Sequence, residues 1–285
     1  IARFTVQETQ LGNYEGKYLK IHRKTRATLM DIIDDKSVGV IEEDPERNIV
    51  KIAKPVGVIG ALSPSTNPGA TPVIKSISAV KGRNAIIIAP GVAGTISPED
   101  IDAQADLIGG ASVFVTQLEQ PMPAAHRALE IARAGGAKTI LNPAPAADLA
   151  PDMLRLCDYV TPNETEAEGI TGVKVTSLED AKKAADVLLD IGVGAAIITL
   201  GENGVLYRDK NETHHVPIFK AGPVVETTGA GDAFNGGFAT ALAEGMTPLE
   251  AVRFGSATAG ISVTRPGTAP SMPSRDEIDA LLAQE

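Results

Sequence analysis

Short apolar segments alternate with longer amphipathic segments from residue 97 onward, and this alternation limits the folds that the chain can adopt. Residues 112–119 and 195–201 are apolar runs of the length expected for buried strands. Residues 123–136 and 176–192 are typical of helices, and a glycine pair ends the first of them. Strands that alternate with helices of about 12 residues indicate an α/β fold, with a mostly parallel sheet and helices on both faces in three layers.

Further segments extend this pattern. Ser97, Pro98 and Asp100 form a helix start signal, because they supply a capping side chain, a proline in the first turn and an acid three positions after the cap. The other expected elements are strands within 138–145, 158–163 and 205–209, a strand that includes His214 and His215, and helices near 230–244, 248–263 and 274–283.

The first 90 residues are organised differently. Residues 1–35 are charged and helix-prone, whereas residues 38–61 form two β-rich runs around a polar turn, which predicts a hairpin. A turn at 63–69, an amphipathic stretch to Val80 and an apolar run at 85–89 follow. Their order predicts strand, helix, strand.

Composition excludes several classes of protein. The length of 285 residues corresponds to one large α/β domain or two ordinary ones. Because 43% of the residues are hydrophobic and 22% are charged, we expect a packed core rather than disorder. The net charge of −10 argues against nucleic acid or an anionic membrane as the main partner. One cysteine, Cys157, rules out a disulfide framework and a cysteine zinc cluster, and we expect it to be a buried small hydrophobe. With no leader pattern and no apolar run of about 18 residues, we expect a cytoplasmic protein, either whole or a fragment.

The sharpest motif is TTGAGDAFNGG at residues 227–237. Gly229, Ala230 and Gly231 are small enough for a ligand to approach the backbone closely. Because a helix is expected to begin there, its N–H groups and positive dipole end form a site for a phosphoryl group. Asp232 lies in the first turn, where its carboxylate can accept the proton of an attacking hydroxyl. The alternative interpretation is a glycine-rich turn with an acidic cap. The spacing matches neither a Walker A loop nor GxGxxG.

Other polar groups follow predicted strands, where ligands bind in open α/β sheets. Asn163 follows the strand at 158–160, and a capping box with Glu166 is the alternative to a ligand role. The segment 199–204 also ends a strand, and its Asn203-Gly204 pair is equally a good hairpin turn. Glu119 ends the strand 112–119, so it is either a sugar contact or a solvated strand end.

Several segments together resemble the ribokinase family of PfkB-type carbohydrate kinases. They are TTGAGDAFNGGF, TPNETE, ITLGENG, VTQLEQP, ILNPAPA and AVRFGSATAGISVTRPGTAPSMPSRDEID, within a match from about residue 90 to the end. The resemblance implies Asp232 as catalytic base, Gly229 to Gly231 as the anion hole, and Glu119 with Asp232 as sugar contacts. The residues that it implies around ATP, whose phosphates Mg²⁺ would bridge, are Asn163, Thr199, Leu200, Gly201, Glu202, Asn203, Gly204, Gly231 and Ser256.

The resemblance also implies a monovalent cation behind the anion hole, held mostly by backbone carbonyls. Its site maps to Glu226, Thr228, Ser262, Arg265, Gly267 and Ser271. Ribokinases usually carry Asp in place of Glu226, so the extra methylene bears on cation activation. The hypothesis is that K⁺ still stimulates turnover.

Residues 1–90 are similar instead to the amino-terminal part of acylating, CoA-dependent aldehyde dehydrogenases. In that family residues 55–61 and 70–81 would begin an NAD domain, and Asn67 would match the residue that steadies the oxyanion, although 63–69 is equally well a simple turn. The first strand and β lid of a ribokinase are not found. We therefore expect an aldehyde-dehydrogenase-like part at 1–90 and a ribokinase-like part at 91–285, as a natural fusion, a chimera or a mis-assembled reading frame.

The expected function is ATP-dependent phosphorylation of a pentose, ribose to ribose 5-phosphate, impaired by loss of the amino-terminal half of the sugar site. The alternatives are a non-catalytic nucleotide-binding fragment and a fragment of an NAD- or CoA-dependent aldehyde dehydrogenase. The expected partners are the sugar and ATP, and a homodimer remains open.

Overall fold

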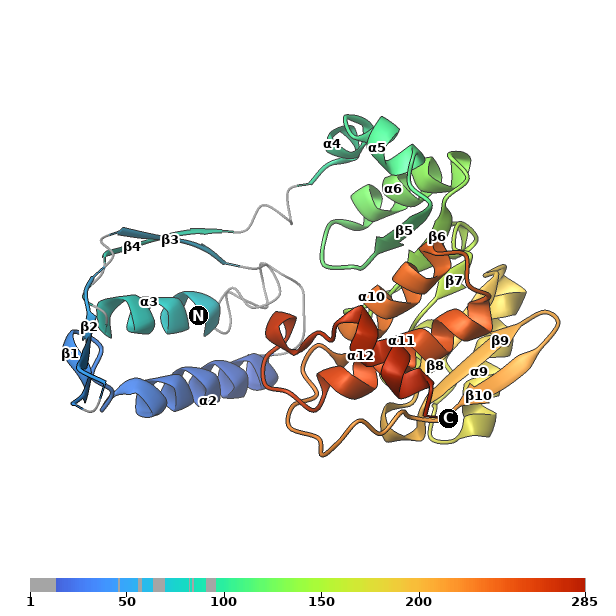
Figure 1. Cartoon of the computed structure of the whole chain (residues 1–285). Helices are drawn as coiled ribbons and strands as arrows, with labels where there is room; N and C mark the ends of the chain where they lie inside the picture. The colour runs from blue at the N-terminus through green and yellow to red at the C-terminus, as the bar shows by residue number, and fades with distance from the viewer. Residues whose placement is uncertain are drawn as a thin grey trace. The chain divides into compact units, whose positions relative to one another are not determined.

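The structure, a computed structural model, describes residues 14–45, 47–55, 58–63, 70–81, 83, 85–90 and 96–284 (Figure 1). The chain divides into two compact units, Ile1–Thr95 and Ile96–Glu285. Asn67 lies outside the described residues. No helix in the described ranges combines the length and the apolar character that crossing a bilayer requires.

The first unit contains the hairpin and the strand–helix–strand order that its sequence predicts. In the hairpin, Gly39 is paired with Ala53 and Asp44 with Ile49. The following two strands are parallel, with Val58 opposite Ala85. The described elements are α2 (Tyr14–Ile32), β1 (Gly39–Asp44), β2 (Ile49–Ala53), β3 (Val58–Ser63), α3 (Ala70–Lys81) and β4 (Ala85–Pro90).

The second unit contains a six-stranded sheet in the order β10-β9-β8-β7-β6-β5. The strands β5 to β8 are parallel, and β9 and β10 are antiparallel to their neighbours, so the prediction of a mostly parallel sheet is confirmed. The strands are β5 (Val113–Thr116), β6 (Lys138–Leu141), β7 (Tyr159–Val160), β8 (Ala195–Thr199), β9 (Val205–Asp209) and β10 (Thr213–Val216).

Helices cover both faces of this sheet (Figure 1). Successive strand residues point to opposite faces, so Ile140 and Ile197 pack in one core cluster while Leu141 and Ile198 pack in the other. The first cluster includes residues of α10, α11 and α12, and the second includes residues of α6, α8 and α9. The helices are α4 (Pro98–Asp102), α5 (Ala105–Gly109), α6 (Met122–Ala134), α7 (Pro151–Leu154), α8 (Glu164–Thr171), α9 (Leu178–Ile191), α10 (Ala230–Ala243), α11 (Pro248–Ser262) and α12 (Arg275–Leu282).

The prediction of a buried strand at 112–119 is wrong in the length and the burial of that strand. It ends at Thr116, and Val115 is 38% exposed. After Thr116 the chain turns, and the Leu118 N–H donates to the Ala144 carbonyl rather than to a continuing ladder. In the described part of the chain, β5 is the last strand of its sheet, and β3 and β4 form a separate two-stranded sheet.

Candidate active site

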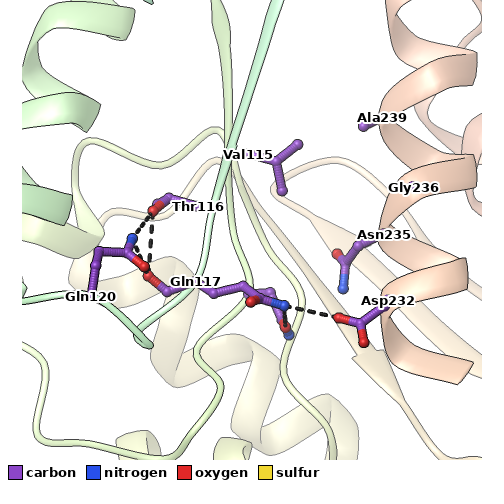
Figure 2. Close-up of a pocket in the computed structure, with 9 residues that line it drawn as sticks. Val115, Thr116, Gln117, Gln120, Asp232, Asn235, Gly236 and Ala239 are labelled. Carbon is purple, nitrogen blue, oxygen red and sulfur yellow. Dashed lines mark hydrogen bonds between the residues drawn. The ribbon is translucent and has the colours of Figure 1, made fainter. Parts of the chain in front are cut away.

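A cavity of about 420 Å³, lined by both polar and apolar groups, lies where the carboxyl ends of β5 and β6 meet the start of α10 (Figure 2). This is the edge at which open α/β sheets bind ligands. Amide side chains dominate its polar lining, and one carboxylate joins them. The lining residues are Val115, Thr116, Gln117, Gln120, Asn142, Asp232, Asn235, Gly236 and Ala239.

Asp232 lies in the first turn of α10, as its motif predicts. The first backbone hydrogen bond of the helix type runs from the Ala233 N–H to the Gly229 carbonyl at 2.9 Å, so the N–H groups of Gly231 and Asp232 precede the helical ladder. The Ala230 N–H donates to the Thr227 carbonyl at 3.2 Å. The start of α10 thus has backbone donors and a helix dipole suited to an anion, with the Asp232 carboxylate beside them.

Gly229 is required by both its conformation and its surroundings. Its φ of 82° lies in the left-handed region, and a Cβ there would lie 3.1 Å from Cγ2 of Thr268. The close approach also shows that the loop containing Thr268 packs against the start of α10. A larger residue at 229 would strain the turn that precedes Asp232.

A chain of hydrogen bonds connects the sheet to Asp232. The Thr161 carbonyl accepts from Nδ2 of Asn142 at 2.9 Å, and Oδ1 of Asn142 accepts from Nε2 of Gln117 at 3.4 Å. The same Nε2 donates to Oδ1 of Asp232 at 2.9 Å (Figure 2). A second route runs from the Thr161 hydroxyl to Oδ1 of Asn235 at 2.7 Å, and from Nδ2 of Asn235 to the Gly231 carbonyl at 2.9 Å.

Sequence reasoning missed these amide residues. Asn142 directly follows β6, and Gln117 directly follows β5, so their positions after strands are the signal that could have found them. The structure does not bring Glu119 to the cavity: its side chain is exposed and is not among the lining residues, whereas Gln117 and Gln120 on either side of it are.

The two segments expected around a nucleotide lie together. A parallel bridge joins Asn163 to Thr199, and the Thr199 N–H donates to the Pro162 carbonyl at 2.9 Å. Asn163 is also the N-cap of α8, where its Oδ1 accepts from the Glu166 N–H at 2.9 Å and Glu166 accepts from the Asn163 N–H. The predicted capping box is therefore confirmed. Burial raises the pKa of Glu166 above its usual value, and the Asn163 hydrogen bonds oppose this.

The segment after β8 forms a tight turn. Residues Gly201–Asn203 are a 3₁₀ turn, and the Leu200 N–H donates to the Gly204 carbonyl at 2.8 Å. Gly204 has a φ of 86°, and a Cβ there would lie 2.2 Å from the Val216 carbonyl oxygen. The predicted turn is confirmed. Glu202 and Asn203 on it are exposed, and a ring nitrogen of His215 lies 2.6 Å from the Asn203 carbonyl oxygen.

Ser256 lies on α11 and is 7% exposed. Its Oγ has no hydrogen-bond partner among the described residues, which is unusual for a buried hydroxyl. The structure thus leaves this candidate nucleotide contact with an unsatisfied polar atom.

Three of the residues expected at a monovalent cation lie together. Glu226 accepts a hydrogen bond from the Gly267 N–H at 2.8 Å and another from Thr228, and these bonds lower its pKa. The side chains of the other candidates bond to neighbouring groups. Ser271 donates to the Thr268 carbonyl at 2.6 Å, and Ser262 donates to the Ala259 carbonyl at 2.9 Å. Arg265 forms an ion pair with Glu277. Their backbone carbonyls are the groups that the resemblance assigns to the cation.

No group of three or more His, Cys, Asp or Glu side chains suited to a metal occurs in the described ranges. Mg²⁺ in phosphoryl-transfer enzymes is commonly held by substrate phosphates, water and only one or two carboxylates. The cavity lining contains one carboxylate, that of Asp232, and this donor set is compatible with a magnesium ion held mainly by phosphate oxygens and water.

Comparisons with known proteins agree with this geometry. The profile of the family "pfkB family carbohydrate kinase" matches residues 65–275. A ribokinase of Staphylococcus aureus is 39% identical over 200 residues, which are 70% of this chain and 66% of that protein. A ribokinase of Haemophilus influenzae is 42% identical over 199 residues, which are 70% of this chain and 65% of that protein. The chain thus spans just under two thirds of the length of these relatives.

Solved structures show the same relationship. The crystal structure of a ribokinase from Thermotoga maritima has a TM-score of 0.61 and 33% sequence identity, and the match covers 82% of each chain. A shorter match of another kind is also present, because an acetylating succinate-semialdehyde dehydrogenase of Clostridium kluyveri is 49% identical over 89 residues, or 31% of this chain and 20% of that protein. The family profile, the relatives and the architecture together show that the chain belongs to the pfkB family of carbohydrate kinases.

Proposed function

We propose that this chain catalyses ATP-dependent phosphorylation of a pentose, converting ribose to ribose 5-phosphate as a ribokinase does. The single observation that carries the proposal is that Asp232 lies beside the N–H groups at the start of α10 and lines the cavity. The similarity to two proteins named ribokinase, at 39% and 42% identity, supports ribose as the sugar.

The proposed mechanism uses two features of the start of α10. The Asp232 carboxylate accepts the proton of the attacking sugar hydroxyl, while the N–H groups of Gly231 and Asp232 stabilise charge on the transferring phosphoryl group. Because phosphoryl transfer has a loose transition state, most of the rate comes from positioning and electrostatics rather than from a strong base.

The cavity lining suits a neutral, hydroxyl-rich substrate. Gln117, Gln120, Asn142 and Asn235 provide amide donors and acceptors, and Asp232 is the only ionisable side chain among the lining residues. Their oxygens can accept from sugar hydroxyls, and those amide N–H groups that are not already bonded within the site can donate to them. Glu119, implied as a sugar contact by its motif, would have to reach the substrate from outside this lining.

The nucleotide would lie along the carboxyl ends of β7 and β8. Asn163 and the turn at 199–204 are adjacent there, and Ser256 has an unsatisfied hydroxyl. Magnesium, when bound with the phosphates, would supply charge neutralisation during transfer.

The test of this function is ADP release with ribose and MgATP, measured by a coupled assay. The chain as it exists should turn over, and Asp232→Asn should lower kcat by at least about 100-fold, because general base catalysis contributes that much or more. The exposed Asp190 on α9 offers a matched control, and Asp190→Asn should leave kcat unchanged. Full activity of Asp232→Asn would remove the proposed base.

A specific observation also favours a second function, which is ATP binding without phosphoryl transfer. The comparisons cover just under two thirds of two ribokinase relatives, and among the described residues the sheet of the second unit ends at β5. If the unmatched part of those relatives supplies the rest of their sugar site, this chain binds ATP without transferring phosphate. Stabilisation by MgATP in a thermal unfolding assay, with no ADP release, would identify this outcome.

We also propose that the chain joins an aldehyde-dehydrogenase-like part at 1–90 to a ribokinase-like part at 91–285. The dehydrogenase match over 89 residues supports the first part. Aldehyde dehydrogenase chemistry needs a reactive thiolate, and the sole cysteine, Cys157, is buried with its pKa raised to about 12. The dehydrogenase-like part is therefore proposed to lack that activity, and aldehyde-dependent NADH formation would contradict this.

Potassium activation is the remaining part of the proposal. Glu226, Thr228 and Gly267 are held together, and the Glu226 carboxylate provides a negative charge beside the loop whose carbonyls would bind the cation. Turnover is expected to be several-fold faster in potassium than in sodium buffer. Glu226→Asp, which restores the residue usual in ribokinases, should keep or increase this ratio. Equal rates in the two salts would refute the proposal.

A further inference from the structure

A first-turn aspartate can serve as a proton acceptor only if one of its oxygens is presented to the substrate. Asp232 is exposed, so its carboxylate needs a partner that fixes its orientation. Gln117 provides that partner, because its Nε2 lies 2.9 Å from Oδ1 of Asp232 across 115 residues of sequence. Figure 2 shows the Gln117 side chain reaching from the end of β5 to Asp232 on α10.

The buried Thr161 carbonyl fixes which group donates and which accepts in the series of hydrogen bonds from Thr161 to Asp232. The Thr161 carbonyl can only accept, so the Asn142 side chain must place Nδ2 there and turn Oδ1 toward Gln117. Asn142 is buried, with 8% of its surface exposed, so its side chain has little freedom to turn over. Because Oδ1 of Asn142 can only accept, Gln117 must present its NH₂ group, and the second hydrogen of that group is directed at Asp232.

We propose that Gln117 is a positioning residue for the proton acceptor Asp232. Its amide holds Oδ1 of Asp232, and this makes Oδ2 the oxygen that takes the proton of the sugar hydroxyl. The hydroxyl proton moves to Oδ2 as the hydroxyl oxygen bonds to phosphorus and ADP leaves. This inference rests on the proposed kinase function. The role belongs to Gln117, which directly follows β5, and not to Glu119.

The variant Gln117→Glu tests the role, because it keeps the shape of the side chain and removes the NH₂ group. At about pH 7.5 two carboxylates would face each other, so kcat should fall at least about tenfold, with the KM for ATP unchanged. At about pH 5.5 the pair would share a proton, and the protonated acid could donate to Oδ1 as the amide does. The ratio of variant kcat to parent kcat should therefore rise several-fold at the lower pH.

The exposed Gln104 supplies the matched control. Gln104→Glu introduces the same charge change elsewhere in the second unit, and its kcat ratio should stay near one at both pH values. Circular dichroism spectra of the variants should match the parent. An unchanged kcat in Gln117→Glu, or a reduced kcat whose ratio does not change with pH, would overturn the inference.

A second measurement separates this inference from the proposed function. No ADP release by the parent chain would refute the kinase activity itself. The contact can still be tested through a double-mutant cycle of Gln117→Leu and Asp232→Ala, read as Tm, because each single variant removes one partner of the hydrogen bond. Non-additive Tm shifts are expected if the two side chains act as a pair, and additive shifts would overturn the inference whether or not the chain is active.

Discussion

The two adjacent glycines of α10 should respond oppositely to substitution by alanine. A Cβ at Gly236 meets nothing within 4 Å, whereas a Cβ at Gly237 would lie 2.5 Å from Oγ1 of Thr258 and 3.1 Å from the Gly255 Cα. Thr258 is buried, and its Oγ1 donates to the Phe254 carbonyl at 2.8 Å, so it cannot rotate away without losing that bond. Gly237 therefore allows α10 and α11 to approach closely.

The magnitude follows from two opposing effects. Replacing a helical glycine by alanine stabilises a helix by about 1 kcal/mol. Overpacking of a tight interface costs about 1–3 kcal/mol, and backbone contact at position 237 favours the upper end. Gly237→Ala should thus lower the free energy of unfolding by about 2 kcal/mol, and Gly236→Ala should raise it by about 1 kcal/mol. For a unit of this size, a difference of ~3 kcal/mol corresponds to Tm values roughly 6–12 °C apart.

Thermal unfolding followed by near-ultraviolet circular dichroism suits this comparison, because the chain has no tryptophan and its two buried tyrosines, Tyr159 and Tyr207, lie in the second unit. The parent, Gly236→Ala and Gly237→Ala are compared for stability alone, since Gly236 lines the cavity. The reasoning would be refuted if Gly237→Ala were as stable as the parent, or if both alanine variants shifted Tm in the same direction.

Two further predictions follow from ionisable groups. Cys157 is 1% exposed and burial raises its pKa to about 12, so Ellman's reagent should label it only after unfolding in urea, and rapid labelling of the folded chain would contradict this. The hydrogen bond from Arg265, with help from Ser274, lowers the pKa of Glu277 from 4.5 to about 2. The ionised Glu277 carboxylate should therefore stabilise the fold above pH 4.5, and this contribution should be lost as the pH falls toward about 2. In Glu277→Gln, the urea midpoint of unfolding should depend less on pH over that interval, and an unchanged dependence would contradict the prediction.

The candidate active site lies within one of the two units. Asp232, the α10 terminus and the adjacent segments at Asn163 and Thr199 all lie in the second unit. The family profile begins at residue 65, inside the first unit, which ends at Thr95. Because positioning supplies much of the rate of phosphoryl transfer, the outcome of the turnover assay depends on whether the second unit can hold the sugar by itself.

Local features of the site were predictable from the sequence. The capping boxes at Ser97 and Asn163 and the turn at Gly204 were expected and are confirmed. The position of Asp232 in a first turn was also expected. Each of these depends on residues within a few positions of one another, so side-chain type and spacing are sufficient to specify them.

The length of β5 was not predictable in the same way. The apolar pattern from 112 to 119 is that of a strand, but the chain leaves the sheet after Thr116 because Leu118 bonds to Ala144, which belongs to a loop after the neighbouring strand. Periodicity describes which side chains prefer burial, and it contains no information about which distant backbone group takes a given N–H.

The order of helices and strands, the glycine-rich start of α10 and the carboxylate within it were determined by the sequence itself, because they arise from local propensity and spacing. Tertiary structure alone decided that Gln117 contacts Asp232, that Asn142 orients Gln117, and that Glu119 stays outside the cavity lining. The physical reason is that these contacts form between strand ends and a helix far apart in the chain, where packing of the whole sheet sets the distances.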